Sequence, residues 1–150
     1  MKALTLTQPW ATFVALGLKR IETRSWPTSY RGPLAIHAAK GFPGWVRDLC
    51  ELDFADVLGE WKLRISDFPR GVIVARTALR RCQRTETLLS NGLSPLEQRL
   101  GDYAAGRWGF VFGDIERLAV PIPAKGALGL WDWEEEGERK SRHLWDWEED

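Results

Sequence analysis

Cysteine, histidine and methionine are scarce in this 150-residue sequence, and their scarcity narrows the chemistry open to the protein. The two cysteines, Cys50 and Cys82, form no Cys-x-x-Cys pair and cannot build a disulfide framework for a domain of this size. The two histidines, His37 and His143, stand far apart and belong to no metal-ligand motif. We therefore expect reduced thiols, no metal site and no cofactor.

Long hydrophobic runs are also missing. No apolar run approaches the roughly 18 to 20 residues that cross a bilayer, and the first residues show no signal-peptide pattern. The phosphate-loop, Gly-x-Gly-x-x-Gly and Gly-x-Ser-x-Gly motifs do not occur, which excludes the commonest nucleotide-hydrolase, dinucleotide and esterase interpretations. With 44% hydrophobic and 28% charged residues, the sequence predicts one folded, cytoplasmic domain that has no membrane partner.

The formal charge is zero because a basic body is balanced by an acidic end. Residues 131–150 hold nine acidic and three basic residues, a net of −6, so the first 130 residues carry +6. A basic body is typical of polyanion-binding modules, although its arginines could equally form solvated faces of strands and helices.

The acidic end contains a repeat, because Leu-Trp-Asp-Trp-Glu-Glu at 130–135 recurs at 144–149. We interpret the first copy as the end of the fold and residues 134–150 as an acidic, Trp-containing tail. Such a tail is either frayed or folds back on a basic groove as a nucleic-acid mimic.

Tryptophan is abundant, with nine residues. Trp10, Trp45 and Trp61 fall in apolar-periodic segments and are expected to pack in the core. Trp26 lies instead in a polar, proline-containing loop, where an aromatic side chain could stack on a base.

Apolar periodicity and turn residues predict five to six short strands with short helices between them. The clearest strand is 71–79, and 94–103 is an expected helix in which Ser94 caps the N-terminus and Pro95 is the first helical residue. Because no regular βαβ alternation is present, the pattern favours a mixed α+β fold, a small β-barrel with flanking helices, over a doubly wound sheet.

Five polar side chains cluster near the N-terminus, namely Gln8, Lys19, Glu22, Arg24 and His37. Glu22 and Arg24 share strand parity, so they should face the same side. If Lys19 joins them, the three form an anion-receptive pocket that contains one acceptor. Plainer interpretations remain open: Lys19 and Glu22 as a surface ion pair, Gln8 as a supplement to a helix N-terminus, and His37 as a hydrogen-bonded core residue.

Several of these segments together resemble the ASCH domain of the PUA-like superfamily. They are Leu-Thr-Leu-Thr-Gln-Pro-Trp at 4–10, Gly-Leu-Lys at 17–19, Ile-Glu-Thr-Arg at 21–24 and Leu-Ala-Ile-His-Ala at 34–38, and the resemblance continues through 71–75, 108–110 and 121–126 to 129–131. It implies a PUA-like barrel over residues 1–133, with a cleft for RNA or a nucleobase. The Gly-x-Lys-x-x-Glu-x-Arg segment would line that cleft, which places Lys19, Glu22 and Arg24 in it and Gln8 and His37 beside it.

Members of this family differ in function. Some relatives resemble amidohydrolases that release acyl groups from N4-acylated cytidine, using a lysine, a threonine three residues later and a glutamate from a later strand. Lys19 matches that lysine, but Glu22 occupies the threonine position, and Thr23 points to the opposite face of an extended segment. Other relatives are similar to ribonucleases or act as RNA-binding modules.

We therefore predict a module that binds RNA or a modified nucleobase. Arg24 and Lys19 would contact phosphate or a base edge, while Glu22 would accept a hydrogen bond from an exocyclic amine. The candidate ligand-binding residues are Gln8, Trp10, Lys19, Glu22, Arg24, Trp26 and His37. In the alternative, a nucleic-acid-related hydrolase, Lys19 and Glu22 are the catalytic acid and base and His37 assists them. A third class, a protein-interaction adaptor, would use the acidic tail.

Overall fold

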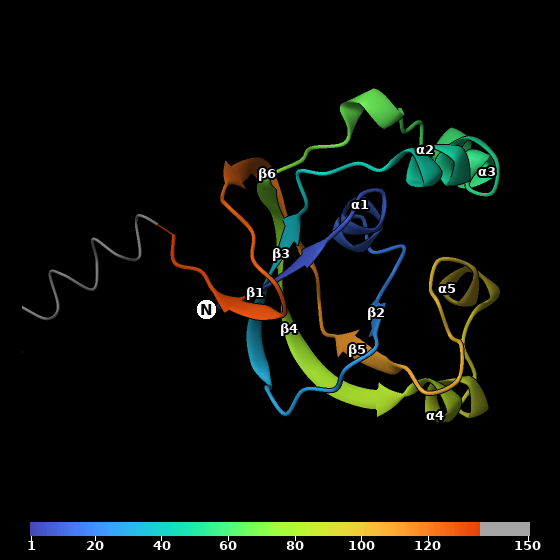
Figure 1. Cartoon of the computed structure of the whole chain (residues 1–150), viewed down its shortest axis with the longest axis vertical. Helices are drawn as coiled ribbons and strands as arrows, with labels where there is room; N and C mark the ends of the chain where they lie inside the picture. The colour runs from blue at the N-terminus through green and yellow to red at the C-terminus, as the bar shows by residue number, and fades with distance from the viewer. Residues whose placement is uncertain (136–150) are drawn as a thin grey trace, which may run out of the picture.

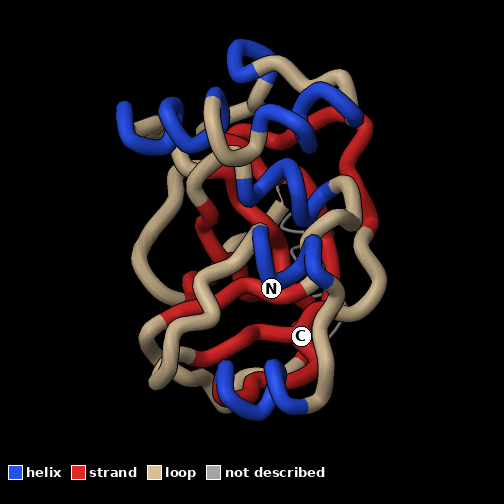
Figure 2. The backbone as a smooth tube through the Cα atoms, turned by 90° about the vertical axis from the view of Figure 1, so that its right-hand side faces the viewer, coloured by secondary structure: helices blue, strands red, loops and turns tan. Residues whose placement is uncertain are grey.

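A mixed sheet with short helices forms the body of the domain (Figure 1). The computed structural model describes residues 1–135. Its strands are β1 (Lys2–Leu6), β2 (Ile21–Arg24), β3 (Gly32–Ala38), β4 (Val72–Arg84), β5 (Trp108–Phe112), β6 (Glu116–Pro123) and β7 (Leu130–Asp132). Its helices are α1 (Trp10–Ala15), α2 (Gly44–Glu51), α3 (Ala55–Glu60), α4 (Thr85–Ser90) and α5 (Pro95–Arg99), with one 3-10 turn, η1 (Ile65–Asp67). Seen from the helical side, the short helices lie over the strands (Figure 2).

The sheet has seven strands in the order β2-β5-β4-β3-β1-β7, and β6 pairs separately with β4. Strands β1 and β3 are parallel and place Thr5 beside His37, whereas the other pairs are antiparallel. The mixed α+β prediction is confirmed. The expected closed barrel is not, because within the described residues the pairing path ends at β2 and β7 without joining them. The expected five to six strands are also too few.

Strand β4 is the long central strand of the sheet. It is 13 residues long and pairs with β3, β5 and β6. Its register shifts between Leu79 and Arg81 in the pairing with β5, and between Ile73 and Ala75 in the pairing with β6. Such bulges bend a strand and increase its local twist. The predicted strand, 71–79, was too short. The last part of β4 carries exposed arginines, including Arg80 and Arg81, and these interrupt the apolar pattern on which the prediction depended.

The core is divided between the sheet and the helices. One cluster joins α1 to β1, β3 and β4, and a second joins α1 to α2, α3 and α5, with Phe13, Phe54 and Leu100 among its buried members. Two tryptophans expected in the core are instead on the surface, since Trp45 is 64% and Trp61 45% exposed. Apolar periodicity placed both residues in partly apolar segments, but it did not reveal which side of α2 and α3 packs against α1 and α5.

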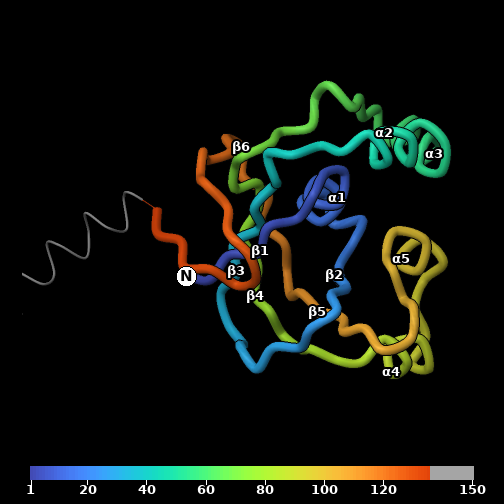
Figure 3. The backbone as a smooth tube through the Cα atoms, in the orientation of Figure 1, coloured from blue at the N-terminus to red at the C-terminus, as the bar shows by residue number. Residues whose placement is uncertain are grey.

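The two ends of the described body lie side by side (Figure 3). The Met1 amine donates to the Trp133 carbonyl at 2.9 Å, and β1 pairs with β7. The first copy of the repeat forms β7, buries Trp133 and brings Glu135 to Arg76. The rest of the expected tail, including the second copy at 144–149, lies outside the described residues. No helix in residues 1–135 is long and apolar enough to span a membrane.

Candidate functional site

A cavity of about 780 Å³ opens beside β2. Glu22, Thr23 and Arg24 contribute to its lining from β2, while Trp10 and Trp45 contribute from α1 and α2. The segment that follows α5 adds further lining residues, among them Gly101, Asp102 and Arg107. Small-molecule sites in proteins are typically concavities of roughly 300–1,000 Å³, so this cavity has the size of a ligand site.

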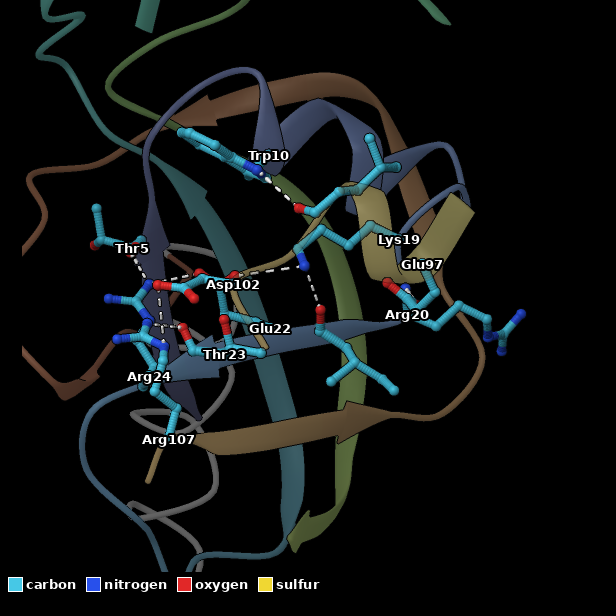
Figure 4. Close-up of polar contacts among 12 residues, drawn as sticks. Thr5, Trp10, Lys19, Arg20, Glu22, Thr23, Arg24, Glu97, Asp102 and Arg107 are labelled. Carbon is cyan, nitrogen blue, oxygen red and sulfur yellow. Dashed lines mark hydrogen bonds and ion pairs between the residues drawn. The ribbon is translucent and has the colours of Figure 1, made fainter. Parts of the chain in front are cut away.

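Glu22 and Arg24 form an ion pair on the wall of this cavity. Arg24 Nη2 lies 3.0 Å from Glu22 Oε2 and also donates to the Thr5 carbonyl at 2.7 Å (Figure 4). The two side chains therefore face the same side of β2, as their strand parity predicted. Arg24 Nε is buried and has no hydrogen-bond partner among the described residues. The pair therefore places a carboxylate and a guanidinium group on the cavity wall in positions that are fixed relative to each other.

Lys19 lies behind this pair and does not line the cavity. Its side chain is fully buried, with Nζ 2.5 Å from the Ile21 carbonyl that accepts its hydrogen bond and 3.8 Å from Glu22 Oε1 (Figure 4). Burial lowers the pKa of Lys19, while the carboxylates of Glu22 and Glu97 oppose that shift. The structure therefore brings Lys19, Glu22 and Arg24 together but presents only Glu22 and Arg24 to the cavity.

Glu97 is a buried carboxylate behind the cavity that was not predicted as a site residue. Its Oε1 accepts a hydrogen bond from the Arg20 backbone at 2.7 Å (Figure 4). Burial raises the pKa of Glu97, and the hydrogen bond from Arg20 and the charge of Lys19 oppose this. The only sequence signal is local: Ser94 caps α5 as predicted, because its Oγ accepts from the Glu97 backbone at 3.1 Å, which makes Glu97 the third residue of the helix.

Trp10 and Trp45 supply aromatic surface to the cavity. The Trp10 indole donates from Nε1 to the Leu100 carbonyl at 2.9 Å, which fixes the ring. Trp45 lies against it, with ring centroids 6.2 Å apart and planes inclined by 42°. The structure does not bring Trp26 to this place: its ring packs edge-on against Phe110 at 5.1 Å. Trp45 was missed as a site residue because apolar periodicity assigned it to the core.

Gln8 also lies away from the cavity. It is fully buried, its Oε1 accepts from the Thr12 backbone at 2.9 Å and its Nε2 donates to the Pro69 carbonyl at 2.7 Å. It therefore ties the first turn of α1 to the segment before β4, which agrees with the plainer interpretation of this residue.

His37 is buried in β3 and lines a different cavity. Its Nε2 lies 2.7 Å from the Ala124 carbonyl, which can only accept, so Nε2 carries a proton and Nδ1 accepts from the Thr5 hydroxyl at 3.1 Å. Burial lowers the pKa of His37, although the hydrogen bond to Ala124 opposes this. Within residues 1–135, no cluster of three His, Cys, Asp or Glu side chains is suited to hold a metal ion.

Comparison with known proteins identifies the family. The family model of the ASCH domain matches residues 4–116. The chain belongs to the ASCH domain family. The resemblance seen in the sequence motifs is thereby confirmed.

Relatives and solved structures agree with this assignment. Over 130 residues this ASCH domain is 27% identical to Activating signal cointegrator 1 of Homo sapiens and of Mus musculus, which covers 85% of the chain and 21% of each relative. The chain therefore spans about a fifth of the length of these curated relatives. The crystal structure of ASCH from Zymomonas mobilis superposes with a TM-score of 0.54 at 16% identity, covering 95% of this chain and 93% of that one. A mutant of the Zymomonas mobilis protein gives the same TM-score of 0.54. At this identity the superposition shows a shared fold.

Proposed function

We propose that this ASCH domain binds RNA or a modified nucleobase, with a base held in the cavity beside β2. The observation that carries the proposal is the fixed Glu22–Arg24 pair on the wall of a cavity that also has an aromatic side. Nucleobases need such a combination, because their edges offer donors and acceptors while their faces stack on aromatic rings.

The Glu22 carboxylate supplies the acceptor. Its side chain is only 13% exposed and lies between Arg24 and Lys19, so it is held in one place. A carboxylate can accept hydrogen bonds from the exocyclic amine of a base, and an adjacent guanidinium can donate to a ring nitrogen or carbonyl. Lys19 acts in this proposal as a positioning residue, since it contacts Glu22 from behind.

The charges around the cavity favour an uncharged group such as a base. Its lining residues include three carboxylates and three guanidinium groups, namely Glu22, Asp53, Asp102, Arg24, Arg99 and Arg107. Several of them pair with each other or with neighbours, including Asp102 with Arg107 at 3.5 Å. A balanced, internally paired set attracts a phosphate weakly but leaves specific donors and acceptors for a neutral ligand.

Trp45 provides the test because it is exposed, so its substitution should disturb the fold little. Stacking of a base on an aromatic side chain contributes about 1–3 kcal/mol, so Trp45→Ala should weaken binding of a short single-stranded RNA pool about tenfold or more. Trp61→Ala is the matched control, because Trp61 is also exposed but does not line the cavity. Equal affinities for both variants, measured by fluorescence anisotropy, would refute the proposal.

A hydrolase is the second candidate, and the buried Lys19 favours it. Burial lowers the pKa of this amine, which lies 3.8 Å from a carboxylate at the cavity, and such pairs are candidates for proton transfer. In this alternative Glu22 faces the substrate and exchanges a proton with Lys19, which lies behind it. Release of acetate from N4-acetylcytidine, or cleavage of RNA, by the wild type but not by Glu22→Gln would establish turnover. No product from either substrate would leave binding as the function.

A further inference from the structure

A second cavity, of about 670 Å³, lies beside the first and has a different charge. Apart from His37, its charged or titratable lining residues are Lys40, Arg70 and Lys125, and no carboxylate lines it. These three come from separate places in the chain, after β3, before β4 and after β6. Their convergence therefore depends on the fold rather than on a local basic run.

None of the three cations has a carboxylate partner within residues 1–135. Arg70 is oriented by a hydrogen bond from Nη1 to the Lys40 carbonyl at 3.2 Å and by the Phe42 ring, whose centroid is 5.9 Å from the guanidinium carbon. Neighbouring cations without a counter-charge repel one another, and an anion between them relieves that repulsion.

Thr5 separates the two cavities and lines both of them. On one side its carbonyl accepts from Arg24 at 2.7 Å. On the other side its hydroxyl accepts from the Trp131 indole at 3.0 Å and donates to His37 Nδ1 at 3.1 Å. The two cavities therefore meet at Thr5, whose hydroxyl and carbonyl are already hydrogen-bonded, so a ligand that fills both cavities would extend past this residue.

We propose that the second cavity binds the phosphate backbone of a nucleotide strand whose base occupies the first cavity. This inference rests on the proposed function and makes it more specific: the ligand is a single-stranded oligonucleotide rather than a free nucleoside. The charge of the two cavities matches the two parts of such a strand. The paired and balanced cavity fits a base, and the purely basic one fits a phosphate, which lysine and arginine bind by charge-assisted hydrogen bonds.

His37 lines this cavity but supplies no charge to the bound phosphate. Its Nε2 donates to Ala124 and its Nδ1 accepts from Thr5, so both ring nitrogens are used within the protein. The anion would therefore contact the three cations, and histidine protonation is not required for binding.

The test compares a labelled single-stranded RNA with cytidine on the same proteins. In Lys40→Ala/Lys125→Ala we expect RNA affinity to fall about tenfold or more at low salt, and the slope of log affinity against log salt to decrease by about 0.7 for each lost phosphate contact. Cytidine affinity should not change. The matched control is Arg64→Ala/Arg81→Ala, which removes two exposed charges that line neither cavity and should alter RNA affinity less than twofold.

The outcomes separate this inference from the proposed function. If the Lys40/Lys125 variant binds RNA like the wild type while Trp45→Ala loses binding, the second site is refuted and the first stands. If Trp45→Ala binds RNA normally and the Lys40/Lys125 variant does not, base binding in the first cavity is refuted. Displacement of RNA by an acidic peptide of equal charge at equal affinity would refute a nucleotide-specific site. Should the double variant unfold, the single substitution Lys125→Glu repeats the measurement.

Discussion

A side chain at Gly126 would collide with the His37–Thr5 pair, so substituting this glycine tests the geometry of that pair. A β-carbon added at Gly126 would lie 2.7 Å from His37 Cε1, 2.9 Å from His37 Nδ1 and 2.9 Å from Thr5 Oγ1. Ordinary contacts between such atoms are about 3.5–4.0 Å, so the overlap approaches roughly 1 Å.

The groups that meet this β-carbon cannot easily move. His37 is hydrogen-bonded through both ring nitrogens and packs edge-on against Trp131, with ring centroids 5.4 Å apart. Overpacking of this kind typically costs about 1–3 kcal/mol, and loss of the Thr5–His37 hydrogen bond adds about 1 kcal/mol. We therefore expect Gly126→Ala to lower the free energy of unfolding by about 2–4 kcal/mol and the Tm by roughly 5–15 °C.

Urea unfolding followed by circular dichroism measures this change directly. Gly41→Ala is the matched control, because a β-carbon there meets no atom within 4 Å. At such an open position the substitution should leave stability unchanged or raise it by up to about 1 kcal/mol, since it restricts the unfolded chain. If Gly126→Ala and Gly41→Ala unfold at the same urea concentration, the arrangement of Thr5, His37 and Gly126 described above is wrong.

Three further predictions follow from other parts of the molecule. Because burial holds the pKa of His37 below its ordinary value, the unfolded chain takes up a proton at a pH where the folded protein does not. The free energy of unfolding should therefore decrease as the pH falls below about 6.5, and urea titrations of His37→Gln should show a smaller decrease. An equal decrease in the variant would contradict this assignment. Ser94→Ala removes the cap that accepts from Glu97 and should destabilise by about 1 kcal/mol in urea unfolding, whereas Ser94→Asp should retain most of the stability. Deletion of 134–150 should leave RNA affinity unchanged or increase it, while loss of binding to a protein partner would favour the adaptor interpretation.

Features that depend on neighbouring residues could be predicted from the sequence. The cap at Ser94 follows from local hydrogen bonding, and Gly17, two residues after the end of α1, has a φ of 77°, a conformation that favours glycine. The shared face of Glu22 and Arg24 follows from the two-residue period of a strand.

Features that depend on contacts between distant segments could not be predicted from the sequence. Glu97 reaches the Arg20 backbone across 77 positions of sequence, and no local pattern links them. The exposed Trp45 has the apolar spacing of a core residue, but it lines a cavity whose other walls come from distant segments, β2 and the residues after α5. Closure of the sheet was likewise expected from strand number and spacing, although it depends on which edge strands meet.

The hydrogen bond between Met1 and Trp133 has a consequence for how this unit combines with other chains. The Met1 nitrogen and the Trp133 oxygen are 2.9 Å apart, so the polypeptide enters and leaves the folded body at one place on its surface. Domains with adjacent ends tolerate insertion into a host loop and circular permutation. A short linker from residue 133 to residue 1, with a new opening in the exposed turn between α4 and α5, should therefore yield a permuted chain with the same sheet.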